Sequence, residues 1–244
     1  MTELRTYIVL AAYPAVVMFV FDWCGPVSRW AFRSRSTPVP IGLRRIGERR
    51  GRFLLLIKYA LVFLLVETLA GKQQWQLVSI ATHPRPWPVV FASGILGGLL
   101  IFGFRRALAL VWQPIAVSES NDSALRGSVR LWLFTFIVGG FVEEFWRALC
   151  ISSFQQHAYG AIPADSLPAI AFSIAHMSGL PSRIPGGLEI AAAESATGLL
   201  FGAIFIWSGN LVSACLASIM FYSCDFYWLR RRYGCSASDG PRSG

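Results

Sequence analysis

Three charged side chains interrupt a long apolar run near the middle of the chain. The run, residues 129–154, consists mainly of Leu, Phe, Ile, Val and Trp, yet Glu143, Glu144 and Arg147 lie inside it. This composition is typical of a membrane span, where a charged group at the bilayer centre costs about 3 kcal/mol even on insertion scales. Charges at this depth need a partner or a function, and this requirement constrains the fold more than any other feature.

The spacing of these charges predicts ion pairing on one helix face. Glu143 and Arg147 are four residues apart and Glu144 and Arg147 are three apart, with the glutamate first, which is the favoured order. The arginine can neutralise one carboxylate, and the other is left over. A leftover intramembrane carboxylate indicates a functional site. The alternative is a structural ion pair that locks this helix to a neighbour.

Composition places the chain among polytopic membrane proteins. Of its 244 residues, 55% are hydrophobic and 14% are charged, against about 25% charged in soluble proteins. Because backbone polar groups within a bilayer must be paired internally, we expect an all-α transmembrane bundle of about seven spans. The net charge of +9 indicates membrane topology and contact with anionic lipid rather than nucleic-acid binding.

Seven apolar segments predict the spans. They are residues 6–21, 53–70, 89–104, 129–154, 167–180, 188–208 and 210–229. Arg105 and Arg106 are expected to end the third span, and residues 107–116 to lie at the membrane interface. Within one membrane domain we expect N-terminal spans with a basic loop (1–127), a helical core (128–229) and a basic tail (230–244).

Arginine is distributed unevenly between the two sides of such a bundle. The loops after the first and third spans, the turn after the fifth and the C-terminal tail hold most of it. The opposite side holds only Arg5, Lys72 and Arg85. The positive-inside rule therefore predicts an N-terminus outside the cell and a C-terminus in the cytoplasm.

A histidine follows the glutamates on the next predicted helix. His176 lies one helical turn after Phe172 in the sequence FSIAH. A lone histidine on an apolar helix is more often a core residue than a catalyst. Beside a carboxylate, however, an imidazole can share a water molecule and help to remove its proton near neutral pH.

The last two segments carry further polar residues. Ser218, Tyr222 and Asp225 are spaced four and three apart, so we expect them on one face of the last helix. Asn210 is expected to cap that helix. Glu194 is expected either to line the same cavity or to pair with another span. Gly198 and Gly202, and the GILGG sequence of the third span, predict close helix contacts.

Together these motifs resemble the CPBP family, which comprises the type II CAAX prenyl proteases and the bacteriocin-processing (Abi) proteins. The resemblance rests on the EE–R cluster, FxxxH, and a GLxxG…SGNL entry into a last helix, over residues 139–225. It implies a helical bundle with a polar cavity open to one leaflet, in an integral protein of a bacterial inner membrane. It also implies a glutamate-dependent intramembrane endopeptidase that needs no metal or other cofactor.

The resemblance further implies roles for individual residues. In the family, a glutamate of EExxxR and the histidine of FxxxH activate a water molecule, which points to Glu143, Glu144 and His176 as the catalytic residues. The arginine here follows at EExxR, so either glutamate can be the base; Glu143 is preferred and Glu144 is the alternative. Supporting roles fall to Arg147, Phe172, Asn210, Ser218 and Tyr222.

The last helix departs from the family pattern. Ser218 and Tyr222 occupy the positions where the family has a histidine and an Asn or Asp that hold the oxyanion. Their hydroxyl groups can still donate hydrogen bonds, but losing one oxyanion donor can cost about 100-fold in rate. Three functions follow: an endopeptidase that acts on a membrane-embedded or membrane-tethered peptide; a non-catalytic member that binds a membrane protein; and, last, a transporter with a carboxylate relay.

Overall fold

A computed structural model describes six parts of the chain, and within them the secondary structure is entirely helical. The described ranges are residues 3–18, 56–69, 85–111, 129–157, 160–178 and 187–233. They form seven helices: α1 (Glu3–Met18), the helix of residues 56–69, α5 (Trp87–Val111), α7 (Val129–Gln156), α8 (Ala161–Ser178), α9 (Gly187–Ser208) and α10 (Leu211–Tyr233). The predicted all-α class is confirmed.

Each predicted span corresponds to one of these helices, with two corrections. Arg105 and Arg106 do not end the third span, because α5 continues to Val111. The fifth helix begins at Ala161 rather than at residue 167, and Pro168 lies inside it. The basic loop 25–52, the loop 117–127 and the tail beyond residue 233 lie outside the described residues.

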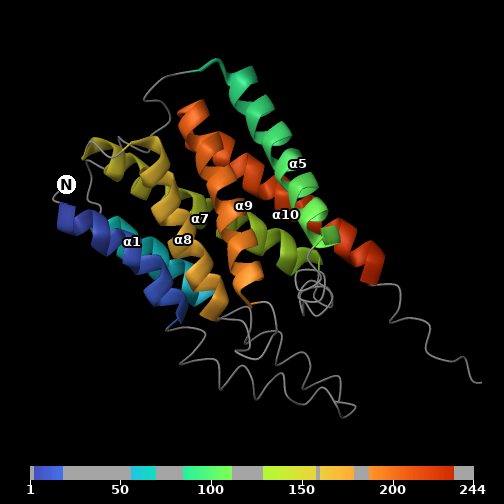
Figure 1. Cartoon of the computed structure of the whole chain (residues 1–244), viewed down its shortest axis with the longest axis horizontal. Helices are drawn as coiled ribbons and strands as arrows, with labels where there is room; N and C mark the ends of the chain where they lie inside the picture. The colour runs from blue at the N-terminus through green and yellow to red at the C-terminus, as the bar shows by residue number, and fades with distance from the viewer. Residues whose placement is uncertain are drawn as a thin grey trace, which may run out of the picture.

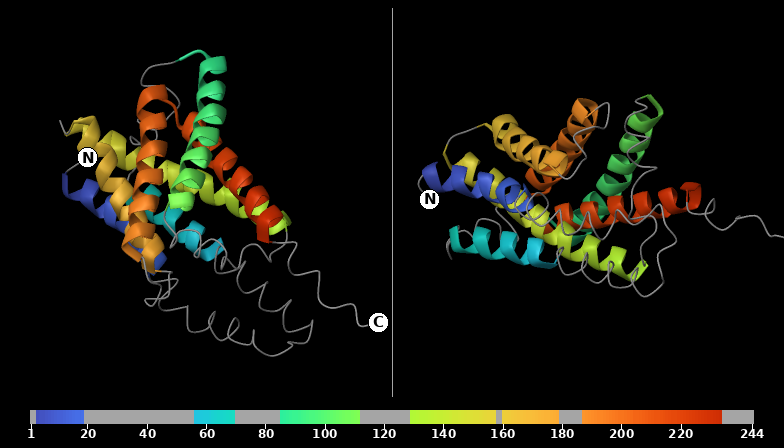
Figure 2. Two further views of the ribbon diagram at one scale, coloured as in Figure 1. Left: turned by 45° about the vertical axis from the view of Figure 1, so that its right-hand side comes forward. Right: turned by 90° about the horizontal axis from the view of Figure 1, so that it is seen from below.

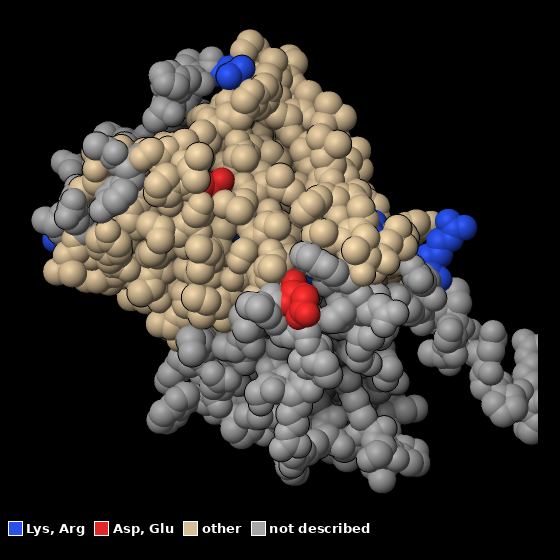
Figure 3. Space-filling model, viewed as in Figure 1, with Lys and Arg blue, Asp and Glu red and all other residues tan. Residues whose placement is uncertain are grey.

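Three of the described helices are long and apolar enough to cross a membrane. They are α5, residues 189–208 of α9 and residues 211–231 of α10. The stretches Leu4–Val17 and Ala161–Ala175 are apolar but shorter. Figure 3 shows that few charged side chains interrupt the described surface on the face in view. The chain is therefore an integral membrane protein, while the number of seven spans remains a prediction.

Helix α7 runs behind α8 and α9 in the view of Figure 1 and contacts α1, α8, α9 and α10 (Figures 1 and 2). Its C-terminal half is flanked by α1 and the helix of residues 56–69, and its N-terminal half runs beside α10 (Figure 2). The main hydrophobic core surrounds the C-terminal half and includes Tyr13, Val62, Trp146, Leu149 and Phe172, all nearly inaccessible to solvent. The charged residues of α7, Glu143, Glu144 and Arg147, are buried in the same half of the helix.

Close helix contacts occur where glycine removes a side chain. On α5, a Cβ atom at Gly94 would lie 2.7 Å from the Cβ atom of Leu216 on α10. On α9, a Cβ atom at Gly198 would lie 3.3 Å from Ala169 on α8. Glycine and other small residues let transmembrane helices approach closely. The predicted close contacts at GILGG and at Gly198 are confirmed.

The connection between α9 and α10 is a tight turn with a capped helix start. Gly209 has a φ of 62°, in the left-handed region that favours glycine. Asn210 follows it, and its side-chain oxygen accepts a hydrogen bond of 2.8 Å from the backbone N–H of Val212. This is the predicted N-cap, which aims α10 back across the bundle.

Candidate functional site

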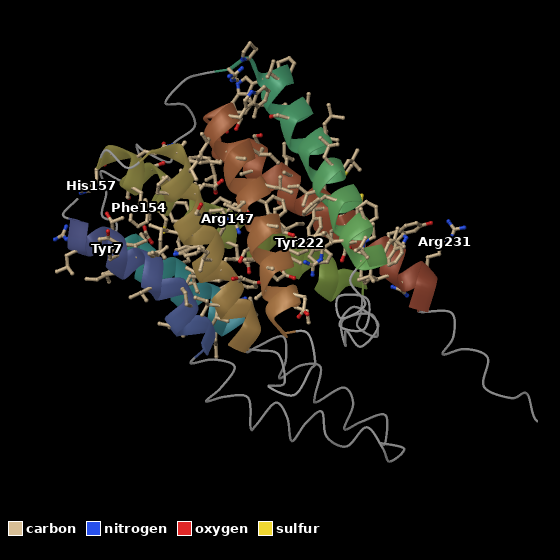
Figure 4. The ribbon with its side chains drawn as sticks, in the orientation of Figure 1. Tyr7, Arg147, Phe154, His157, Tyr222 and Arg231 are labelled. Atoms are coloured by element: carbon tan, nitrogen blue, oxygen red, sulfur yellow. The ribbon has the colours of Figure 1, made fainter. Side chains whose placement is uncertain are left out.

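The two glutamates and the arginine of α7 are buried together in the bundle. Glu143, Glu144 and Arg147 expose only 4%, 2% and 1% of their surface. Figure 4 shows Arg147 within the bundle, away from the helix ends. Burial of this degree is very costly for an unpaired charge, so their partners decide what the cluster can do.

Arg147 forms an ion pair with Glu144, three residues before it on the same helix. Its guanidinium also lies 4.8 Å from the ring centroid of Phe172 on α8 and 5.6 Å from that of Phe201 on α9. Cation–π contacts at these distances stabilise a desolvated guanidinium. Of the two pairings that the spacing allows, the structure forms the one between Glu144 and Arg147, and three helices hold it.

Glu143 takes its partners from the N-terminal part of the chain. The hydroxyl group of Tyr13 on α1 donates a hydrogen bond of 2.8 Å to Glu143 Oε1. Lys58 Nζ, on the helix of residues 56–69, lies 3.5 Å from the same oxygen. The phenol of Tyr59 also interacts with this carboxylate. These partners of Glu143 were not predicted from the sequence, although a lysine inside an apolar segment, Lys58, was a signal for one of them.

The two adjacent carboxylates therefore have different surroundings. Glu143 is bound from α1 and the helix of residues 56–69. Glu144 pairs with an arginine that lies against rings of α8 and α9. Consecutive residues on a helix point in directions about 100° apart, which explains the division. Polar or charged partners therefore lie on two sides of α7, those of Glu143 on one side and that of Glu144 on the other.

Phe172 connects the two sides. Its ring is buried, stacks on Tyr13 at a centroid distance of 5.6 Å, and lies beneath the guanidinium of Arg147. His176 lies one turn later on the backbone of α8, and its side chain lies outside the described residues. The predicted meeting of His176 with a glutamate thus stays a prediction. Phe172, which resemblance alone had selected, is a direct neighbour of the charged cluster.

Ser218 and Tyr222 of α10 both contact α7. Ser218 is fully buried, and a Cβ atom at Gly140 would lie 3.1 Å from its Oγ atom. None of the described residues forms a hydrogen bond with this hydroxyl group. Tyr222 stacks on Phe136 at a centroid distance of 5.2 Å. Both candidates therefore lie on the face of α10 that packs against the helix with the glutamates.

The remaining acidic candidates are paired with α5 instead. Arg106 Nη2 lies 2.6 Å from Asp225 Oδ1, and Arg105 Nη2 lies 2.6 Å from Glu194 Oε1. Asp225 therefore forms an ion pair with α5. Glu194 takes the second of its two predicted places, the pair with another span. Both pairs tie α5 to its neighbours.

The described residues contain no group of three His, Cys, Asp or Glu side chains arranged to hold a metal ion. Among them, Asn210 has the structural role already described, at the start of α10. The polar chemistry of the described site therefore includes the carboxylates of Glu143 and Glu144, one guanidinium, one ammonium and several hydroxyl groups. The buried carboxyl group of Asp165 on α8 also interacts with Glu144 and Arg147. Such a set can hold and deprotonate a water molecule and donate hydrogen bonds to a carbonyl oxygen.

The comparison with protein families selects the same part of the chain. Residues 126–223 match the family of Rce1-like type II CAAX prenyl endopeptidases. The match contains Glu143, Glu144, Arg147, His176 and Ser218. No curated protein and no solved structure shows a significant match to the chain. The resemblance to the CPBP family is confirmed, and residues 126–223 are similar to an intramembrane protease family.

Proposed function

We propose that this chain is an intramembrane endopeptidase that hydrolyses a membrane-associated peptide with a water molecule activated by Glu143 and His176. The observation that carries the proposal is the buried cluster of two glutamates and one arginine on α7, within the residues that match the protease family. Arg147 pairs with Glu144. Glu143 is thus the carboxylate that the arginine leaves over, which supports its assignment as the base.

The chemistry is a general-base hydrolysis. Glu143, with the imidazole of His176, takes a proton from a water molecule, and the water oxygen attacks the peptide carbonyl carbon. The carbon–nitrogen bond then breaks, and the proton passes to the departing amine. Glu144 and Arg147 hold the helix face in position by their ion pair. Glu144 remains the alternative base.

The negative charge that develops on the carbonyl oxygen needs hydrogen-bond donors. Ser218 is the proposed donor, because its buried hydroxyl group faces α7 and has no partner among the described residues. Tyr222, one turn further on α10, is the proposed second donor. Preorganised donors of this kind commonly contribute 100-fold or more to the rate. In this arrangement two hydroxyl groups replace the family's usual histidine and its Asn or Asp.

The substrate is proposed to be a membrane-embedded or membrane-tethered peptide. A site buried among apolar helices is reached from the lipid more readily than from water, and the family resemblance implies access through a polar cavity open to one leaflet. The proposed orientation has the N-terminus outside and the C-terminus in the cytoplasm of a bacterial cell, from the distribution of arginine.

A second candidate function is supported by the same departure on α10. With Ser218 at the position of the expected histidine, the domain would keep its fold and bind a membrane protein or peptide without cleaving it. In such a binding protein the buried ion pairs act only as structural contacts. The two functions differ in one measurable property, which is the production of new peptide termini.

The test compares wild type with Glu143→Gln and Glu144→Gln in membranes that contain a panel of endogenous membrane proteins. Glutamine keeps the side-chain shape and hydrogen bonding, whereas alanine would also remove packing. The control is Glu67→Gln, which removes an exposed carboxylate from the helix of residues 56–69. New termini that appear with wild type and with the control, and are lost in Glu143→Gln at equal expression, support the endopeptidase. Identical termini in all four samples contradict it.

A further inference from the structure

Two residues outside the family match contact the proposed base directly. The hydroxyl group of Tyr13 and the ammonium group of Lys58 both reach Glu143 Oε1, at 2.8 Å and 3.5 Å. They lie 130 and 85 residues before Glu143 in the sequence and belong to the N-terminal helices. The matched residues 126–223 therefore do not contain every group that contacts this carboxylate.

Tyr13 is held in place by aromatic rings from two helices of the matched region. Its side chain is fully buried and stacks on Trp146 of α7 at 4.7 Å and on Phe172 of α8 at 5.6 Å between ring centroids. A fully buried ring that stacks on two other rings has little freedom to move, which restricts the position of its hydroxyl group. That hydroxyl group in turn fixes the position of Glu143 Oε1.

Lys58 is a buried cation whose neighbours stabilise a positive charge. Its ammonium group lies 4.6 Å from the ring centroid of Tyr59 and 5.6 Å from that of Tyr13, besides its contact with Glu143. Ring faces stabilise a cation without competing for its proton. The helix of residues 56–69 thus carries a positive charge into the core at the point where α7 carries a negative one.

This arrangement matters because a buried carboxylate without a nearby cation tends to take up a proton. A protonated carboxyl group cannot act as a general base. The other charges that face Glu143 do not replace Lys58: Glu144 is negative, and Arg147 pairs with Glu144. Among the described residues, the other titratable neighbours are phenols, Tyr13 and Tyr59 from the N-terminal helices and Tyr222 from α10. From α8, His176 is the proposed partner of Glu143, and its side chain lies outside the described residues.

We infer that Tyr13 and Lys58 are positioning residues for the proposed base: Tyr13 orients the Glu143 carboxylate, and Lys58 keeps it ionised. This inference rests on the proposed function for its meaning in catalysis. Neither residue touches the substrate in this scheme. It assigns the first two described helices a part in the reaction, beyond closing the bundle.

The first experiment measures the protonation of Glu143 directly, by infrared difference spectroscopy on the purified full-length protein. Glu143→Gln identifies the band of this carboxyl group. We expect wild type and Lys58→Arg to show an ionised carboxylate at neutral pH, and Lys58→Met to show a protonated carboxyl group. The control Arg5→Met removes an exposed cation from α1 and should resemble wild type. An ionised Glu143 in Lys58→Met would overturn the inference for Lys58.

The second experiment measures the pH dependence of terminus formation. In Lys58→Met the acid limb of the pH–rate profile should move to higher pH, and the rate should recover at alkaline pH. In Tyr13→Phe, which keeps the stacked ring, the rate should fall on the order of tenfold across the profile, because one hydrogen bond to a charged group is lost. Tyr227→Phe, at an exposed position on α10, is its control. An unchanged rate in Tyr13→Phe would overturn the role of Tyr13.

These results separate the inference from the function on which it rests. If wild type forms no new termini, the endopeptidase proposal fails, and the infrared comparison still decides whether Lys58 holds Glu143 ionised. If termini form and the Lys58→Met profile keeps its shape, the inference fails and the proposed function stands. Tyr13→Phe preserves packing, so the role of Tyr13 remains testable should Lys58→Met fail to fold.

Discussion

Gly98 on α5 lies directly against the backbone of α10, so that a Cβ atom at position 98 would be 2.5 Å from the carbonyl oxygen of Ala217. The same interface contains a hydrogen bond of 2.8 Å between the hydroxyl groups of Ser93 and Ser213. Small residues therefore set the distance between these two helices. Since α10 also carries Ser218, this contact helps to position the proposed oxyanion donor.

Gly98→Ala should destabilise the protein, because a methyl group at this position meets backbone atoms that cannot rotate away. Overpacking of this kind costs about 1–3 kcal/mol. Gly103→Ala is the matched control, since a Cβ atom there meets nothing within 4 Å, and in a helix alanine is favoured over glycine by up to about 1 kcal/mol. In thermal unfolding experiments in detergent, only Gly98→Ala should have a lower midpoint than wild type. Equal midpoints for the two variants would contradict the close contact.

The ion pair between Arg105 and Glu194 gives a second prediction. Arg105→Met should destabilise the bundle by about 1–3 kcal/mol, because it leaves a partly buried carboxylate without this partner. The double variant Arg105→Met/Glu194→Gln should recover part of the loss, since no carboxylate then remains. Chemical unfolding of wild type, these two variants and Glu194→Gln gives the four free energies of unfolding of a double-mutant cycle. Strictly additive changes would show that the pair does not couple α5 to α9.

This pair also explains why one boundary was not predictable from the sequence. Two adjacent arginines after an apolar run are typical of a span that ends at the membrane surface. In the structure, Arg105 and Arg106 instead meet carboxylates on α9 and α10, and Arg106 lies 4.3 Å from the ring centroid of Trp228. Partners 89 and 119 residues away cannot be read from local composition.

The helices and the possible pairings on α7 were predictable because both depend on residues that are close together in the sequence. Apolar runs identify helices locally, and the spacing of Glu144 and Arg147 restricts them to one face. The partners of Glu143 come from distant segments, so only the assembled bundle reveals them. The sequence therefore identified the charged cluster and two possible partners for Arg147, and left the choice between them and the role of the N-terminal helices to the structure.

The contact between Gly202 and Asp165 gives a third prediction, on the packing of α8 and α9. A Cβ atom at Gly202 would overlap the carboxyl group of Asp165. Gly202→Ala should therefore destabilise the protein, and Asp165→Ala in the same chain should relieve the overlap. Pulse proteolysis of both single variants and the double variant should give a coupling of about 0.5–3 kcal/mol. A coupling of zero would mean that the two residues do not meet.

The final prediction separates stability from activity at Ser218. Its hydroxyl group is fully buried, and no described residue bonds to it. A buried polar group without a partner lowers stability by about 1–3 kcal/mol, so Ser218→Ala should leave the thermal midpoint unchanged or raise it. Because the lost hydroxyl group is the proposed oxyanion donor, terminus formation should fall about 100-fold.

Ser213→Ala is the matched control for this substitution, because Ser213 is equally buried on the same helix but bonds to Ser93. It should lower stability by about 1 kcal/mol and leave the rate of terminus formation near that of wild type. The two serines thus predict opposite outcomes in the two measurements. A Ser218→Ala variant that keeps the wild-type rate would exclude this hydroxyl group from the reaction. The oxyanion would then need a different donor on α10, and Tyr222→Phe would be the next variant to measure.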